Sequence, residues 1–96
     1  MDYGVVDSNS AGDQEAPAYE VPAVGEAIKV YDGTSWQRTV PGVYLGFEHV
    51  SGDFFMHHVR NDAGVENMLE SYEVFRRHDV SGGTEWISLT KRPRRR

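Results

Sequence analysis

The aromatic residues in the middle of the chain are the first candidates for chemistry. Most of the Tyr, Trp and Phe residues lie between residues 31 and 75, and Asp32 and Asp53 lie among them. The face of an aromatic ring attracts a Lys or Arg cation by about 0.5–2 kcal/mol. Rings at the edge of a small domain, with a carboxylate beside them, are therefore suited to hold a cationic side chain of a partner. Rings of this kind also suit packing against the chain's own termini or a second subunit.

Strand alternation predicts which rings are exposed, because successive residues of a strand face opposite sides. If Ile28 and Val30 face the core, Tyr31 faces outward. If the alternate apolar residues of 43–47 face inward, Tyr44 faces outward as well. Phe54 and Phe55 cannot both face inward without a bulge. The predicted binding rim consists of Tyr31, Asp32, Trp36, Tyr44, Phe55 and Tyr72.

The four histidines, His49, His57, His58 and His78, raise the question of a metal or catalytic site. His57 and His58 are adjacent, so a regular strand directs them to opposite faces. Two histidines from neighbouring strands leave a zinc site short of the three protein ligands that catalytic zinc usually takes. The chain contains no nucleophile elbow, Gly-rich phosphate loop or His-Glu-x-x-His helix. We therefore expect no metal, no cofactor and no enzymatic activity, and half-buried or surface histidines.

The C-terminal sequence KRPRRR is strongly basic. Its cations are Lys91, Arg92, Arg94, Arg95 and Arg96, and its proline disfavours a helix. Such a segment can contact phosphates with an affinity that falls steeply with salt. It can also act as a nuclear localisation signal or bind an acidic partner. The alternative is a solubilising tail that folds back on the acidic N-terminal residues.

The charge is unevenly distributed along the 96 residues. Residues 1–26 carry a charge of −6, residues 27–90 carry −4 and residues 91–96 carry +5, for a net charge of −5. A folded nucleic-acid-binding surface normally has a basic patch within the domain itself, and residues 27–90 are acidic.

The absence of Cys excludes disulfides and fits a reducing compartment. We expect an intracellular protein, cytoplasmic or nuclear, with a virion component as the alternative. No apolar run approaches the roughly 18 residues of a membrane span.

Turn signals divide the chain into four parts. Residues 1–24 have few large apolar residues, which predicts a flexible acidic leader that cannot offset its ordering entropy. Residues 25–80 contain short alternating segments separated by Gly, Asn and Asp turns, a spacing typical of an all-β barrel or sandwich. Residues 81–90 suit an additional edge strand, and residues 91–96 form the basic tail. The predicted strands are 27–31, 36–40, 43–50, 54–60 and 65–69, followed within 69–77 by one helical turn that leads into a strand.

This pattern over residues 25–77 resembles the small SH3-like barrels, and within them the Tudor and chromo-barrel type. The resemblance rests on Val30-Tyr31-Asp32-Gly33 followed by Trp36, on residues 54–59 after a Gly turn, and on Ser71-Tyr72-Glu73-Val74. It implies an antiparallel barrel of five to six short strands with a turn of helix before the closing strand. It also implies that aromatic residues and an acid converge on a cationic ligand.

The sequence therefore predicts a non-catalytic interaction module that binds a protein or peptide through an aromatic rim. One alternative is a small structural or accessory subunit of a larger assembly, viral or from a mobile element, or a homo-oligomer, whose termini become ordered on contact. A second is a nucleic-acid-associated protein that uses its Arg-rich tail. A third is an acidic body that mimics DNA, although −10 over the first 90 residues is a modest charge for mimicry.

Overall fold

The described part of the chain folds as an all-β structure with a single helical turn. The computed structural model describes the backbone of residues 16–32 and 35–92, and their side chains except at positions 35 and 36. The elements are β2 (Ala27–Asp32), β3 (Ser35–Ser51), β4 (Phe54–Asn61), β5 (Glu66–Glu70), the 3₁₀ turn η1 (Ser71–Glu73), β6 (Val74–Val80) and β7 (Gly83–Ser88). The all-β class and the helical turn that leads into a strand are confirmed.

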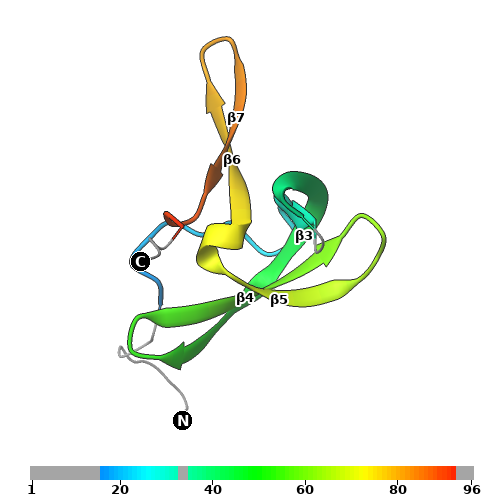
Figure 1. Cartoon of the computed structure of the whole chain (residues 1–96). Helices are drawn as coiled ribbons and strands as arrows, with labels where there is room; N and C mark the ends of the chain where they lie inside the picture. The colour runs from blue at the N-terminus through cyan, green and yellow to red at the C-terminus, as the bar shows by residue number, and fades with distance from the viewer. Residues whose placement is uncertain (1–15, 33–34, 93–96) are drawn as a thin grey trace.

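The strands form one antiparallel sheet in the order β5-β4-β3-β2-β6-β7. Strands β2 to β5 follow one another as a meander. The η1 turn then carries the chain back, so that β6 pairs with β2 through Val30↔Val74 and Lys29↔Phe75. The sheet does not close, because β5 and β7 remain as edges of its described part. The β6–β7 hairpin projects from the rest of the sheet at the top of Figure 1.

Strand β3 is longer than predicted. The sequence predicted a break at Pro41-Gly42, but β3 continues through both residues. Pro41 pairs with Lys29 of β2, and the pairing with β4 begins only at the next residue, where Gly42 is paired with Asn61. Pro41 therefore lies where β3 has a strand on one side only, a position that tolerates a missing N–H donor. At Gly42 a Cβ atom would lie 2.9 Å from the Arg60 carbonyl oxygen, so the close approach of the two backbones requires glycine.

A core cluster lies on the inner face of the curved sheet. Ile28 and Val30 of β2 are both buried, as predicted. Leu89, which follows β7, folds back into the same cluster, and its N–H donates to the Val74 carbonyl at 2.9 Å. The buried members are Ile28, Val30, Tyr44, Val59, Val74 and Leu89.

The orientation predicted for Tyr44 is wrong, and a bulge in β3 is the reason. Tyr44 pairs with Val59, whereas the next paired residue is Gly46, so Leu45 is inserted without a partner. Gly46 has φ +132°, a conformation that side-chain-bearing residues rarely adopt. The insertion reverses the alternation, so Tyr44 faces the core before the bulge and Phe47 faces the same side, opposite buried His57, after it. Regular alternation through the bulge had placed Tyr44 outside.

Residues 16–24 pack against the sheet, although the sequence assigned them to a flexible leader. Pro22 is buried, and the Tyr19 hydroxyl lies 2.9 Å from Nε2 of His57. Glu20 lies 3.6 Å from the guanidinium of Arg76 on β6. The composition of this segment is poor in large apolar residues, but its one tyrosine supplies a polar partner to a buried histidine. Residues 1–15, the rest of the predicted leader, lie outside the described residues.

Candidate functional site

Three aromatic side chains lie on the outer face of β2, β6 and β7. Tyr31 and Lys29 share this face of β2, and Lys29 is paired with Phe75 of β6. Phe75 is in turn paired with Ser88 of β7, which shares its face with Trp86. The rings of Tyr31 and Phe75 meet edge to face, with centroids 5.2 Å apart and an interplanar angle of 86°. We call Tyr31, Phe75 and Trp86 the aromatic face; each of the three is half-buried.

Two cations of the chain itself lie over this aromatic face. The Lys29 ammonium is 5.0 Å from the centre of the Trp86 ring. The guanidinium carbon of Arg92 is 5.8 Å from the centre of the Tyr31 ring. Both distances fall within the roughly 6 Å over which a ring face attracts a cation. The aromatic face is thus able to hold Lys and Arg side chains, and in this structure it holds two.

A groove opens beside Tyr31 at one end of the sheet. Its volume is about 530 Å³, and Tyr31 is among its lining residues. Apolar side chains from three strands, Val30, Val40 and Leu69, contribute to the lining. We call this cavity the end groove. Its size is in the range of sites that accept small ligands or single side chains of a partner.

The charged residues of the end groove are mostly acidic. Asp32, Asp62 and Glu73 line it, against the single cation of Arg38. Arg38 forms an ion pair with Asp32 across the β2–β3 hairpin, and its side chain is 71% exposed. The Glu73 carboxylate accepts a hydrogen bond from the Glu70 N–H at 2.9 Å, which caps the η1 turn. Three carboxylates against one guanidinium favour a positively charged ligand.

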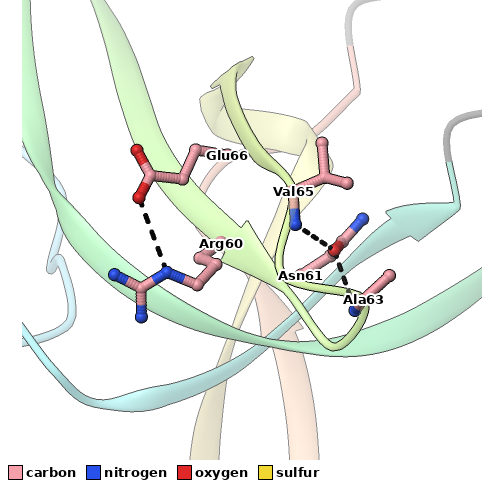
Figure 2. Close-up of polar contacts among 5 residues, drawn as sticks. All are labelled: Arg60, Asn61, Ala63, Val65 and Glu66. Atoms are coloured by element: carbon pink, nitrogen blue, oxygen red, sulfur yellow. Dashed lines mark hydrogen bonds and ion pairs between the residues drawn. The ribbon is translucent and has the colours of Figure 1, made fainter.

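The β4–β5 turn forms one wall of the end groove and is held by its own hydrogen bonds. Asn61 Oδ1 accepts from the N–H groups of Ala63 at 2.9 Å and Val65 at 3.0 Å, as Figure 2 shows. Arg60 and Glu66 form an ion pair across the same hairpin at 3.5 Å (Figure 2). Asn is favoured in such turns because its short side chain satisfies backbone donors that have no strand partner. The wall is therefore preformed.

Among the rim residues whose side chains the structure describes, only Tyr31 and Asp32 come together at the end groove. Tyr44 and Phe55 are buried, with 1% and 5% of their surfaces exposed, so neither belongs to a rim. Phe55 faces inward because it alternates with buried His57 and packs edge to face on Phe47 at 5.7 Å. Tyr72 is half-buried in the η1 turn and does not line the groove. The side chain of Trp36 and the glycine of the predicted Asp32-Gly33 turn lie outside the described part of the structure.

Phe75, Trp86 and Lys29 contribute to the aromatic face and were missed at the sequence level. The alternation of residues 84–90 did place Trp86 opposite Ile87, which is a signal for one exposed face. The alternation did not indicate that β6 pairs with β2. This pairing joins residues more than forty positions apart. Local patterns carry no information on such a pairing.

His57 is the centre of a separate, buried polar cluster. It is fully buried, contrary to the expectation of half-buried or surface histidines. The Tyr19 hydroxyl lies 2.9 Å from Nε2 and the Tyr44 hydroxyl 2.8 Å from Nδ1. A neutral imidazole donates from one nitrogen and accepts at the other, so one tyrosine accepts from the ring and the other donates to it. Burial, with a smaller contribution from the charge of His58, lowers the pKa of His57 to about 4.

The two tyrosine hydroxyls of this cluster are held in the neutral form. Burial raises the pKa of Tyr44 far above its usual range, and the nearby Tyr19 adds to the rise. Burial also raises the pKa of Tyr19, although a hydrogen bond with Ser71 acts in the opposite direction. With two neutral phenols and a neutral imidazole, the cluster satisfies its polar atoms without burying a charge. Its arrangement is that of a structural hydrogen-bond network.

Two other histidines have surface partners. His49 Nε2 donates to the Gly52 carbonyl at 2.9 Å. His58 Nε2 donates to a carboxylate oxygen of Glu48 at 3.0 Å. Within residues 16–32 and 35–92, no group of three or more His, Asp or Glu side chains is placed to hold a metal ion.

The predicted phosphate-binding tail is described only at its first two residues. Lys91 and Arg92 are exposed at the surface. Arg92 lies over Tyr31, as described above. Arg94, Arg95 and Arg96 lie outside the described residues. No helix in the described part of the chain is long and apolar enough to cross a membrane.

Comparison with known proteins adds no assignment. No protein-family model, curated protein sequence or solved structure matches this chain. Function is therefore inferred from the geometry of the end groove and the aromatic face.

Proposed function

We propose that this protein is a non-catalytic interaction module that binds a basic segment of a protein or peptide at the end groove and the adjoining ring of Tyr31. The observation that carries the proposal is the guanidinium over Tyr31 beside a groove lined by three carboxylates. The ring supplies about 0.5–2 kcal/mol of cation attraction. The carboxylates attract a cationic ligand toward the ring and disfavour an anionic one.

We further propose that the fold is an SH3-like barrel with an open side. The support is the order of elements: a four-stranded meander, a 3₁₀ turn, and a strand that returns to pair with the first. This order agrees with the antiparallel strands and the turn of helix before the closing strand that the sequence resemblance to Tudor and chromo-barrel modules implies. The Tudor type is supported less than the SH3-like topology, because two of the proposed rim residues, Tyr44 and Phe55, are buried.

The test is a titration of the ¹⁵N-labelled protein with a short arginine-glycine peptide, followed by amide chemical shifts. We expect shifts at Tyr31, Asp62 and Glu73, and none with a glutamate-glycine peptide of the same length. Tyr31→Ala should weaken binding at least several-fold, because the ring is lost, while Tyr31→Phe should retain it, because the ring face remains.

A matched charge control separates the groove from general electrostatics. Asp62→Asn removes one carboxylate from the groove wall. Glu85→Gln removes one from the β6–β7 hairpin, where Glu85 is paired with His78. The proposal requires that Asp62→Asn weaken binding more than Glu85→Gln. Equal effects of the two variants, or shifts spread over the whole surface, would contradict a defined site.

A second candidate function is that of a subunit in a larger assembly, which the exposed sheet edges favour. The edge strand β5 carries Met68, which is 46% exposed, and Val65 precedes it with 51% exposed. An edge strand presents backbone N–H and C=O groups that can pair with a strand of another chain. Sedimentation of the protein over a range of concentrations tests self-association, and a monomer at all concentrations would exclude the homo-oligomeric form.

A further inference from the structure

The start of the C-terminal basic segment is fixed beside Tyr31. Leu89 is buried in the core and is hydrogen-bonded to Val74. The Thr90 hydroxyl lies 2.6 Å from the hydroxyl of Ser71 in η1, and the Thr90 carbonyl accepts from Ser88 at 2.6 Å. These contacts fix the chain two residues before Arg92, whose guanidinium lies over the Tyr31 ring.

The position of Arg92 is that of a ligand at the proposed site. Its guanidinium carbon lies 5.8 Å from the centre of the Tyr31 ring. Arg92 lies at the exposed surface, so the contact can open without unfolding the domain. Arg92 thus reproduces, within one molecule, the contact that a basic partner would make.

The basic segment is complementary in charge to the end groove. Residues 91–96 contain five cations. The surface near Tyr31 includes the carboxylates of Asp32 and Glu73 at the end groove. A cation tethered beside this surface, as Arg92 is, has an effective concentration in the millimolar range.

We propose that the basic segment occupies the peptide-binding site in cis through Arg92 and acts as an autoinhibitory segment. The inference rests on the proposed function, because it assigns an internal competitor to the same site. A basic partner must displace Arg92 before it can reach the Tyr31 ring. This autoinhibition favours partners that make more contacts than the tethered basic segment makes. The inhibition weakens at high salt, where exposed charges are screened.

The experiment uses the full chain and keeps its length constant. In a tail-neutral variant, Lys91, Arg92, Arg94, Arg95 and Arg96 are all replaced by Gln. The probe is a fluorescent, amidated peptide with the sequence KRPRRR, whose binding is followed by fluorescence anisotropy at low salt. For a probe with a Kd of about 0.1 mM and a tethered competitor at about 1 mM of comparable affinity, we expect roughly ten-fold tighter binding to the tail-neutral variant than to the wild type. Circular dichroism shows whether the variant is folded.

Three controls make the result decisive. Tyr31→Ala in the tail-neutral background should abolish the gain, because the ring is the shared target. Arg92→Gln alone should recover part of the gain, whereas Arg77→Gln should recover none, because Arg77 is paired with Trp86 and Asp79 and not with the Tyr31 ring. Raising the salt should reduce the difference between wild type and the tail-neutral variant.

The outcomes distinguish this inference from the proposed function. Equal binding of the probe to wild type and the tail-neutral variant overturns the internal competitor and leaves the binding site intact. No binding to either protein overturns both. A wild type that sediments as a dimer, with a monomeric tail-neutral variant, overturns the inference in its cis form, because the segment would then occupy a second copy.

Discussion

The aromatic residues on the two faces of the sheet have opposite environments. On the inner face, Tyr44 is buried and its hydroxyl is paired with His57, whose pKa is lowered so that the cluster stays neutral. On the outer face, Tyr31 and Trp86 are half-buried, and cations lie over their rings. The inner aromatics provide packing and a satisfied polar network. The outer aromatics offer ring faces to charge, which is the property that a binding surface needs.

The largest expected difference between the faces is in stability. Tyr44→Ala should lower the free energy of unfolding by about 3–5 kcal/mol, the range for removal of a buried aromatic side chain. Tyr31→Ala should lower it by only about 1 kcal/mol, because the half-buried ring loses an edge-to-face contact with Phe75 and an exposed cation contact with Arg92. Urea denaturation of both variants measures the difference. Similar losses in the two variants would remove the distinction between a structural and a binding face.

A second expected difference is in pH dependence. The pKa of His57 is lowered to about 4 from 6.5, so the unfolded state binds more protons between these values. Its contribution to stability is complete above about pH 6.5 and is lost as the pH falls toward 4. Between pH 6.5 and 4.5 the loss should be roughly 2–3 kcal/mol. Urea denaturation of wild type and His57→Asn at both pH values isolates this contribution, because the carboxylates titrate in both proteins. An identical pH dependence of the two would contradict a neutral buried His57.

The bulge in β3, which reverses the alternation of its side chains between the two faces, gives a third test. Gly46→Ala places a side chain at φ +132°, where only glycine is unstrained. The space near this position is open, since an added Cβ atom would lie 4.0 Å from a Val24 methyl group, so the cost is one of backbone strain. We expect a loss of about 1–3 kcal/mol. Gly52→Ala in the β3–β4 turn, also at positive φ, is a comparison that does not touch the bulge. If only Gly46→Ala shifts the amide signals of Tyr44 and Phe47, the bulge sets their orientation.

The smallest effect concerns the cation over the outer face. Lys29→Gln removes the ammonium above Trp86 and should lower stability by about 0.5–1 kcal/mol, the value for exposed cation–π contacts. Lys29→Arg should keep the interaction. Tryptophan fluorescence during chemical denaturation measures both. A loss of the same size in Lys29→Arg would assign the effect to the aliphatic part of the side chain.

Local signals in the sequence predicted much of the fold. The turns at Ser51–Asp53 and Asn61–Gly64, the burial of Ile28 and Val30, and a helical turn that leads into a strand all agree with the structure. The orientation of side chains was predicted wrongly where one inserted residue reverses the alternation along a strand. Leu45 is unpaired at the bulge, so the inference of orientation that crossed it was reversed for Tyr44.

Residue types and short spacings by themselves determined the all-β class, the turn positions and the separation of an acidic body from a basic end. They did so because turn chemistry and alternation act over a few residues. Only the tertiary structure decided which rings face outward, because β6 returns to β2 and brings Phe75 and Trp86 beside Tyr31 and Lys29. It also brought Tyr19 to His57, since a buried imidazole needs polar partners wherever in the chain they occur.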